Sequence, residues 1–218
     1  MRPSGKIYTC IQGTQEWFLA RLGKATSSRF KDIIAKTKSG YSASRDNYMY
    51  ELLTERLTGT RSEGYTTKAM EWGTEQEVFA RGAYESIKGV FVDEVGFVDH
   101  PTIQNCGGSP DGLIGTDGQL EIKCPETKQH LKYFEGYIPR DYKIQMTGAM
   151  MCTGRDWCDF VSYDPRLPDK LMISIVRYKF DKVLAGEIEA ELGDFLSELD
   201  RLGEKYMALI EKKIDKHV

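Results

Sequence analysis

Apolar residues recur at intervals of three and four along the first 89 residues, the spacing of one face of an α-helix. Turn residues interrupt this pattern, and Gly89 ends its last stretch, so we expect four helices in this part. Helical spacing returns in three segments after residue 125. The second of these follows Pro139, and the last is one long amphipathic helix or a helix pair. The expected helices cover residues 14–22, 27–35, 44–57, 68–88, 126–134, 140–152 and 182–213.

Between residues 90 and 178 the pattern changes to short runs of β-branched and aromatic residues bounded by turn residues. We expect strands at 90–98, 107–114, 119–124, 158–163 and 171–178. Helices on both sides of a compact group of strands indicate a sheet covered by helices. The predicted fold class is α/β (α+β), a central mixed β-sheet flanked by helices. It forms one domain, residues 1–218, with a helical N-terminal part (about 1–89), a sheet core (about 90–178) and a C-terminal helical segment (about 180–215).

The expected C-terminal helix carries apolar residues at alternating steps of four and three, close to a heptad seam. Such a seam packs either on the helix's own domain or against another subunit. We favour packing on its own domain and leave the subunit contact open. The seam consists of Ile188, Leu192, Phe195, Leu199, Leu202, Tyr206 and Leu209.

The composition predicts a folded protein, with 40% hydrophobic and 29% charged residues. No apolar run is long enough to span a bilayer, and no signal-peptide stretch opens the chain, so we expect a cytoplasmic location without a membrane partner. The five cysteines form no CxxC pair, which indicates reduced thiols. The net charge of −3 argues against a large nonspecific basic surface, but it leaves a DNA partner possible.

Two carboxylates and a lysine come together in the expected sheet. Asp111 lies in Ser-Pro-Asp-Gly, and Glu121 and Lys123 follow in Leu-Glu-Ile-Lys after a tight turn at residues 116–118. Antiparallel strands can bring Asp111 beside Glu121, and strand alternation turns Lys123 to the same face as Glu121, with Ile122 facing the core. Carboxylate oxygens suit Mg²⁺, which lowers the pKa of a bound water. A solvated surface hairpin explains Glu-x-Lys alone, whereas the added Ser-Pro-Asp-Gly favours a metal-dependent nuclease centre of the PD-(D/E)xK type.

A third carboxylate is expected from the helix over residues 68–88. Glu77 is the single charge in a stripe with Met70, Gly73, Ala80 and Tyr84. A lone acid on such a face is costly unless it is paired or binds a metal. An ion pair or a rotated helix is the alternative, but a site that needs another carboxylate favours metal ligation.

The helix over residues 140–152 offers a polar group in the same way. Gln145 shares a face with Tyr142, Ala149 and Cys152. Its amide can hold a water or a phosphate oxygen, or it can simply cap a backbone group. Spacing alone favours the backbone cap.

These motifs in this order resemble the phage lambda exonuclease family, the YqaJ-type viral recombinases of the PD-(D/E)xK superfamily. The likeness extends over most of the chain, and it is the combination of motifs that makes it specific. The matching residues are Trp17, Arg21-Leu22-Gly23, Thr26-Ser27-Ser28, Glu71-Trp72-Gly73, Glu77, Ser109-Pro110-Asp111-Gly112-Leu113, Leu120-Glu121-Ile122-Lys123-Cys124-Pro125, Gln145 and Tyr163-Asp164-Pro165-Arg166.

The resemblance implies a restriction-endonuclease-like core and a 5′-to-3′ exonuclease that leaves 3′ single strands for recombination. It implies a ring-shaped homotrimer around double-stranded DNA ends, a single-strand annealing protein as partner, and a bacterial host cell. Two Mg²⁺ ions, with Mn²⁺ as a substitute, would bind each site, and Lys123 would act on the attacking water with Gln145 nearby. By the same likeness, the metal ligands are Glu77, Asp111, Glu121 and the backbone carbonyl of Ile122.

Arg21, Ser28 and Ser109 match family positions that bind the 5′-terminal phosphate. A guanidinium is a bidentate phosphate clamp, and hydroxyl donors at a helix N-terminus favour anions. Thr26 or Ser27 is expected to cap the following helix instead. This cluster predicts faster digestion of 5′-phosphorylated ends than of 5′-hydroxyl ends.

Residues 36–45 and 126–132 depart from the family pattern, which leaves the grip on DNA beyond the cut open. The candidates there are Lys36, Lys38, Arg45, Lys68 and Lys128, each equally a solvated surface charge. Three other functions stay open: a structure- or site-specific endonuclease, a catalytically silent DNA-end-binding module, and a RecB-like nuclease with an iron–sulfur cluster. The complete carboxylate–lysine set argues against the silent module, and the wide spacing of the cysteines argues against the cluster.

Overall fold

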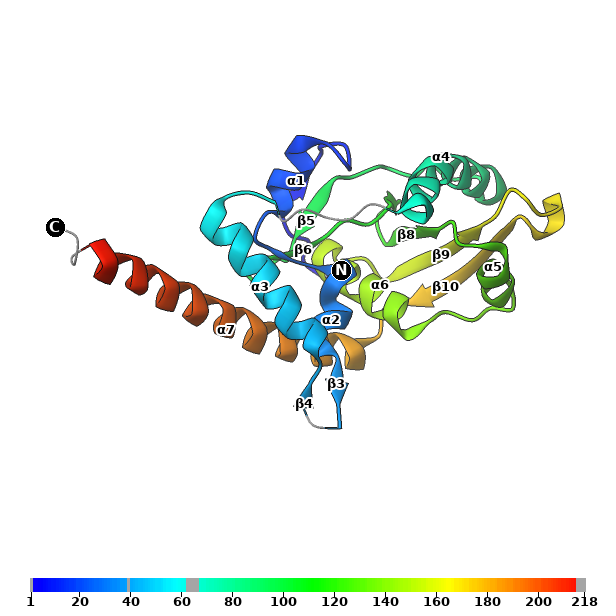
Figure 1. The fold of residues 1–218 in the computed structure, drawn as a ribbon. Coiled ribbons are helices and arrows are strands. Elements are labelled where there is room, and N and C mark those ends of the chain that lie inside the picture. Colours follow the sequence, from blue (N-terminus) through cyan, green and yellow to red (C-terminus); the bar gives the residue numbers. More distant parts are fainter. Residues whose placement is uncertain (1, 39, 62–66, 215–218) are drawn as a thin grey trace.

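The computed structural model describes residues 2–38, 40–61 and 67–214, with side chains through residue 209 (Figure 1). Its helices are α1 Gln15–Arg21, α2 Phe30–Ile34, α3 Ala43–Thr58, α4 Lys68–Lys88, α5 Thr127–Phe134, α6 Arg140–Thr153 and α7 Lys182–Ile214, with 3-10 turns at Ser27–Arg29 and Asp169–Leu171. Its strands are β1 Ile7–Tyr8, β2 Ala25–Thr26, β3 Lys36–Thr37, β4 Gly40–Tyr41, β5 Phe97–Asp99, β6 Cys106–Gly108, β7 Gly112–Ile114, β8 Gly118–Lys123, β9 Trp157–Tyr163 and β10 Ile173–Lys179.

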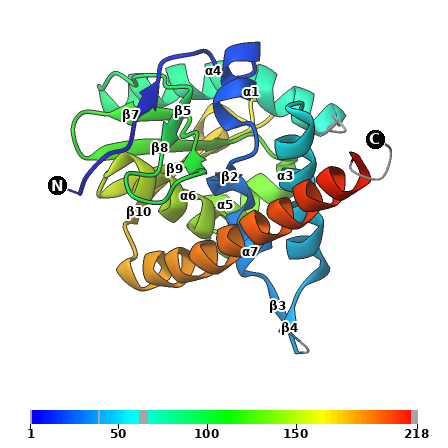
Figure 2. The same cartoon turned by 90° about the vertical axis from the view of Figure 1, so that its left-hand side faces the viewer.

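The strands form two mixed four-stranded sheets and one small hairpin, so the predicted fold class is confirmed but its single central sheet is divided. The sheet with the longer strands has the order β10-β9-β8-β7, in which β8 and β9 run parallel and the outer pairs are antiparallel. The other sheet has the order β1-β5-β6-β2, with a parallel pair between β6 and β2. Helices cover both sheets, as Figure 2 shows from the side.

The division falls inside the strand predicted over residues 107–114, and that prediction is wrong. The chain leaves one sheet at Gly108 and enters the other at Gly112. Pro110 has no N–H to donate to a strand ladder, so a continuous strand cannot run through it. The break frees the side chains of Ser109 and Asp111 on either side of the proline.

The strand predicted over residues 90–98 is also mostly absent. Only Phe97–Asp99 forms a strand there, and Asp93 makes an isolated bridge to Leu113. Val90 and Val92 instead pack against the apolar cluster under α4. These two valines therefore cover the apolar cluster and do not form part of a strand.

The two faces of the β10-β9-β8-β7 sheet are covered by different helices. Helix α4 packs on β8 and β9, where Ala80 and Tyr84 join a buried cluster with Leu120 and Ile122. On the other face, Met146 of α6 packs with a second cluster around Phe160 and Tyr133. The site residues of β8 thus lie in a sheet held between α4 and α6.

Helix α4 ends at Gly89, as the sequence predicts, and its start is capped by Thr67. Thr67 accepts a hydrogen bond from the Met70 N–H, and Gly89 ends the helix with φ of 64°. A left-handed residue at this position is nearly free of strain only in glycine. The observed helix matches the predicted range of 68–88.

Helix α7 is a single helix of 33 residues, not a pair. Ile188, Leu192, Phe195 and Leu199 are fully buried against α2 and α3, so the favoured packing on its own domain is confirmed for this half. Farther along, Tyr206 and Leu209 are 38% and 45% exposed. In Figure 1 this end of the helix projects beyond the rest of the domain.

Two candidate DNA contacts are instead tied to α7. Arg45 is 3% exposed and pairs with Glu198 at 2.8 Å, and Lys36 pairs with Glu191. A guanidinium buried in an ion pair has no access to a DNA groove, so Arg45 was a wrong candidate. Within the described ranges, no helix combines the length and apolarity needed to cross a bilayer.

Candidate active site

The Asp111 carboxylate takes the place of a strand residue at the end of β7. The Asp111 N–H donates to the Leu120 carbonyl at 3.1 Å, and the Ile122 N–H donates to Asp111 Oδ2 at 2.5 Å. Because β7 begins only at Gly112, this side chain completes the ladder beside β8. The hairpin therefore brings Asp111 next to Glu121 and Lys123, as its spacing predicts.

Glu121 is fully buried, and its two carboxylate oxygens differ sharply. The Lys123 ammonium and Gln145 Nε2, the latter at 2.6 Å, both donate to Oε1. Oε2 has no partner among the described residues. Gln145 thus donates to Glu121 and, among the described residues, to no backbone group, so the favoured backbone cap is wrong.

Glu77 reaches this region from α4. Its Oε1 accepts from Arg81 at 2.9 Å, one turn farther along the helix, and Arg81 also pairs with Glu94 at 2.8 Å. Glu77 lines a groove together with Ile122 and Lys123. The structure therefore contains the ion pair that was the alternative for Glu77 and also places the carboxylate beside the β8 site.

The three carboxylates disfavour one another's ionisation. Burial, together with the Asp111 charge, raises the pKa of Glu77 to about 7. Burial likewise raises the pKa of Glu121 to about 7, and the neighbouring Asp111 adds to this. Burial also raises the pKa of Asp111. Such a concentration of costly negative charge is typical of a functional site.

Lys123 is held as a cation in this arrangement. Burial by itself lowers the pKa of its ammonium, but the charges of Glu121 and Asp111 outweigh burial and raise that pKa above its ordinary value. The amine therefore keeps its proton at neutral pH. Lys123 is suited to donate a hydrogen bond or to stabilise developing negative charge, and a role as proton acceptor is disfavoured while these partners stay ionised.

The donor chemistry fits a hard divalent cation such as Mg²⁺. Glu121 Oε2 is a buried acceptor without a partner, and three carboxylates with raised pKa values gain most from an added positive charge. Within the described ranges, however, no three His, Cys, Asp or Glu side chains already converge on one point. The carboxylates are instead engaged by Arg81, by the Ile122 N–H and by Lys123 with Gln145.

These raised pKa values predict that the metal-free protein loses stability as the pH rises. A folded carboxyl with a pKa of about 7, against 4.5 unfolded, holds its proton more tightly than the unfolded chain does. Its stabilising contribution is complete below pH 4.5 and is lost as the pH rises through 7. For the fully buried Glu121 the loss is on the order of 3 kcal/mol. This corresponds to a decrease in melting temperature of roughly 6–12 °C.

Circular dichroism melting in EDTA between pH 5 and 8 measures this effect. Glu121→Gln removes one of the titrating groups, so its melting temperature should fall less than that of the wild type over the same range. Equal pH dependence of the two proteins would show that Glu121 does not titrate there.

A second polar cluster lies on the other side of Pro110. Arg21 Nη1 and Trp17 Nε1 both donate to Ser109 Oγ at 3.0 Å, and Ser28 lines the same cavity as Arg21. The structure thus places Arg21 in contact with Ser109 and puts Ser28 in the wall of the cavity that Arg21 lines. Burial lowers the pKa of Arg21 to about 10, which leaves it charged at neutral pH. Thr26, one of the two predicted caps, makes no capping hydrogen bond to the following turn.

Ser109-Pro110-Asp111 links the two clusters within three residues of chain. Gln12 Nε2 fixes this segment by donating to the carbonyls of Pro110 and Val95, both at 2.9 Å. Sequence reasoning missed Gln12, for which no local pattern exists. It also missed Arg81, although its position four residues after Glu77 is a recognised spacing for an ion pair.

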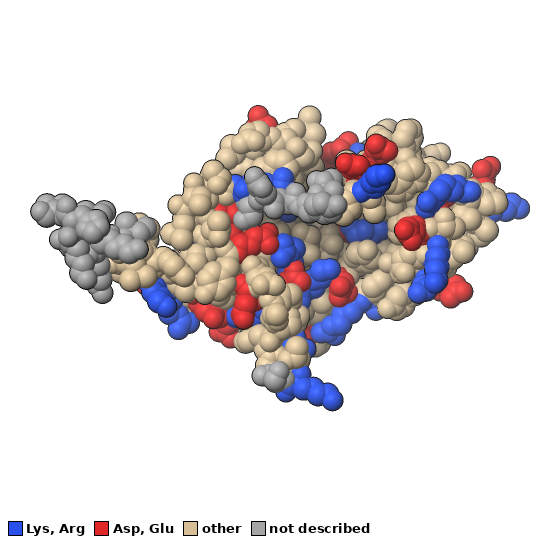
Figure 3. Space-filling model, viewed as in Figure 1, with Lys and Arg blue, Asp and Glu red and all other residues tan. Residues whose placement is uncertain are grey.

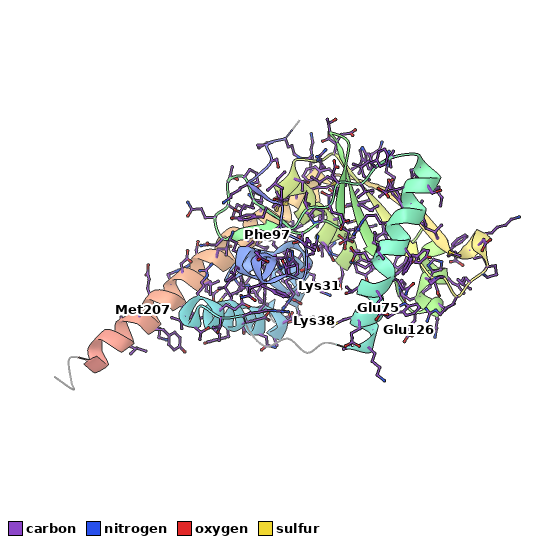
Figure 4. The ribbon with its side chains drawn as sticks, turned by 90° about the horizontal axis from the view of Figure 1, so that it is seen from above. Lys31, Lys38, Glu75, Phe97, Glu126 and Met207 are labelled. Carbon is purple, nitrogen blue, oxygen red and sulfur yellow. The ribbon has the colours of Figure 1, made fainter. Side chains whose placement is uncertain are left out.

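The molecular surface is hollowed between the part over α3 and the part over α4, with basic and acidic side chains around the hollow (Figure 3). Figure 4, seen from above, places Lys31 and Lys38 on one side of this opening and Glu75 of α4 on the other. Helix α4 lines the groove that contains Glu77. Helices α1 and α3 line the cavity that contains Arg21.

Comparisons with known proteins agree with this fold and site. The family model of the YqaJ-like viral recombinase domain matches residues 16–156, and the chain belongs to this family. The chain is similar to the alkaline exonuclease LHK-Exo from Laribacter hongkongensis, with 47% identity over 94% of this chain and 100% of that chain, and a TM-score of 0.83. A structure of LHK-Exo in complex with dAMP matches at 47% identity over the same shares of both chains, with a TM-score of 0.84.

A phage-related exonuclease from Haemophilus somnus 129PT shares the fold. It has 15% identity over 84% of this chain and 96% of that chain, with a TM-score of 0.67. Among curated proteins, none matches this chain. The family and the architecture thus rest on the domain match and on solved structures.

Proposed function

We propose that this protein is a magnesium-dependent exonuclease that digests one strand of linear double-stranded DNA from its 5′ end. The observation that carries the proposal is the convergence of Asp111, Glu121 and Lys123 at the end of β7 and β8, with Glu77 and Gln145 beside them. The family and the likeness to an alkaline exonuclease support the reaction class. The Mg²⁺ requirement and the 5′ start are our inferences.

Each site residue has a defined task in the proposed hydrolysis. Bound Mg²⁺, two ions with Mn²⁺ as a substitute, would supply an activated water and neutralise charge on the phosphate. Glu77, Asp111, Glu121 and the Ile122 carbonyl would hold these ions. Lys123, as a cation, donates to the water or to a phosphate oxygen in the transition state. Gln145 keeps the Glu121 carboxylate oriented.

The 5′ start is supported by the cavity on the other side of Pro110. Arg21, Ser28 and Ser109 supply one guanidinium and two hydroxyls, a suitable set for a terminal phosphate. LHK-Exo has been captured with dAMP, a mononucleotide of the class that such a nuclease releases. The short Ser109–Asp111 segment would therefore couple end recognition to cleavage.

We further propose that three copies form a ring around DNA and that a single-strand annealing protein uses the product. A ring would let a chain of net charge −3 hold DNA, because only the channel lining must be basic. Two apolar side chains on α4 are available for a subunit contact, since Phe79 is 61% exposed and Ile87 is 57% exposed. Light scattering on the purified protein tests the ring: a trimer is expected, and a monomer at micromolar concentration would contradict it.

Topology of the substrate tests the exonuclease itself. One plasmid, either linearised or covalently closed, is incubated with the protein in Mg²⁺ and in EDTA. We expect conversion of the linear duplex to mononucleotides and residual single strands in Mg²⁺, intact closed circles, and no digestion in EDTA. Cleavage of the closed circles would instead identify an endonuclease, and binding without digestion would identify a silent end-binding module.

A further inference from the structure

A second guanidinium faces the cavity that contains Arg21. The cavity lies between α1, α3 and the turn Ser27–Arg29, and Arg61 forms part of its wall beyond the end of α3. Sequence reasoning gave Arg61 no role, and the proposed hydrolysis does not use it. Its position raises the question of what two arginines would bind there together.

Neighbouring aromatic residues of α1 hold the two guanidiniums. Arg21 Cζ lies 4.0 Å from the centre of the Trp17 ring, and Arg61 Cζ lies 4.0 Å from the centre of the Phe18 ring. The two rings meet edge to face with their centres 4.9 Å apart. An aromatic face attracts a cation without neutralising its charge, so both arginines stay available to an anion.

The other cations of the cavity are already paired. Lys24 binds Asp99 at 2.7 Å, and Arg29 binds Asp32 and Glu51. Glu55, which also lines the cavity, accepts the Gly23 N–H at 2.9 Å. By contrast, neither Arg21 nor Arg61 has a carboxylate within 4.0 Å in the described part of the chain. The Arg61 charge lowers the pKa of Arg21 more than the Glu55 charge raises it, so the two guanidiniums leave a net positive charge at the cavity, which favours an anionic ligand.

The charge of the ligand follows from this count. A phosphate monoester at a DNA end carries a charge of about −1.5 to −2 near neutral pH, because its second pKa is near 6. Every phosphate inside the DNA is a diester with a single negative charge. Two unpaired guanidiniums therefore match the terminal phosphate better than any internal one.

We propose that Arg61 is a specificity-determining residue, the second guanidinium of the end-binding cavity, and that it selects a dianionic 5′-phosphate monoester over a monoanionic diester. The proposal rests on the proposed function in that the ligand is a 5′ end of DNA. Arg21 with Ser109 fixes the position of the phosphate, whereas Arg61 on Phe18 responds to its second charge. This selection directs the protein to ends and away from internal sites.

Binding in EDTA tests the proposal without any cleavage. The probes are three fluorescent duplexes that differ only at one 5′ end, which carries a phosphate, a methyl phosphate diester or a hydroxyl. Wild-type protein at pH 7.5 should bind the phosphate most tightly, then the methyl diester. Arg61→Ala should reduce the preference for phosphate over methyl diester by about 10-fold, the lower value for a hydrogen bond to a charged group. Arg61→Lys should restore part of that preference.

Arg201→Ala serves as the matched control, because this arginine lies on the exposed part of α7 and, among the described residues, donates to the Ser197 carbonyl of its own helix alone. It should leave all three affinities unchanged. Full preference for the monoester in Arg61→Ala would overturn the proposal, as would equal wild-type affinity for all three duplexes. Metal-dependent digestion is measured separately. If the protein prefers the 5′-phosphate end in binding but does not digest DNA, the nuclease proposal fails while the role of Arg61 stays supported.

Discussion

Asp111→Asn is expected to lower the rate of DNA digestion by at least about 1,000-fold, because a metal ligand contributes several kcal/mol to stabilising the transition state. The substitution is nearly isosteric. The asparagine oxygen can still accept the Ile122 N–H, which in the wild type binds Asp111 Oδ2. The hairpin should therefore keep its geometry while the site loses a negative charge. Initial rates on linear duplex DNA in Mg²⁺ measure the effect.

Asp117→Asn provides the control for this prediction. Asp117 lies in the turn between β7 and β8, is exposed, and belongs to the same hairpin. The Asp117→Asn variant should digest DNA at the wild-type rate, and both variants should melt cooperatively. A rate for Asp111→Asn within tenfold of the wild type would remove Asp111 from the reaction.

Arg21→Ala is expected to abolish the preference for 5′-phosphorylated ends. Wild-type protein should digest a 5′-phosphorylated duplex faster than its 5′-hydroxyl counterpart by about 10- to 100-fold, the range for hydrogen bonds to a charged group. Arg21 is well placed for this, since Trp17 supports its guanidinium and Ser109 Oγ accepts from it. Without the guanidinium the two substrates should be digested at similar rates.

Arg21→Lys separates charge from shape in the same assay. A lysine keeps the positive charge but lacks the planar fork that binds a phosphate with two hydrogen bonds. It should retain part of the preference. Wild-type protein that digests both ends equally, with no change in Arg21→Ala, would contradict a phosphate role for this cavity.

Local patterns in the sequence were enough to find the hairpin of the candidate active site. Asp111, Glu121 and Lys123 are ordered by a tight turn and by strand alternation, both of which act over a few residues. The predicted burial of Ile122 is confirmed, at 5% exposure. Helix α4 was predictable for the same reason, because its end at Gly89 and its apolar stripe depend on residues close together in the sequence.

What the sequence did not reveal depends on contacts between distant segments. The β1-β5-β6-β2 sheet is built from strands of two or three residues, too short to show a periodic pattern. Gln12 reaches the Pro110 carbonyl across almost a hundred residues of chain. Pro110, however, was a readable signal that the strand over residues 107–114 could not be continuous.

The division of the predicted strand matters for function as well as for fold. Because the chain changes sheets at Ser109–Asp111, Ser109 on one side of the proline accepts from Arg21, and Asp111 on the other side accepts from the Ile122 N–H. A continuous strand would have kept both side chains within one sheet. The departure from regular structure is thus where the two clusters meet.

The most direct test of the proposed function uses linear duplex DNA labelled on one strand, at its 5′ end in one sample and at its 3′ end in another. Wild-type protein and Asp111→Asn are compared in Mg²⁺ and in EDTA. We predict that wild-type protein in Mg²⁺ releases the 5′ label at once as a mononucleotide and the 3′ label only late, and that the other combinations release neither. Early release of the 3′ label, digestion in EDTA, or full activity of Asp111→Asn would contradict it.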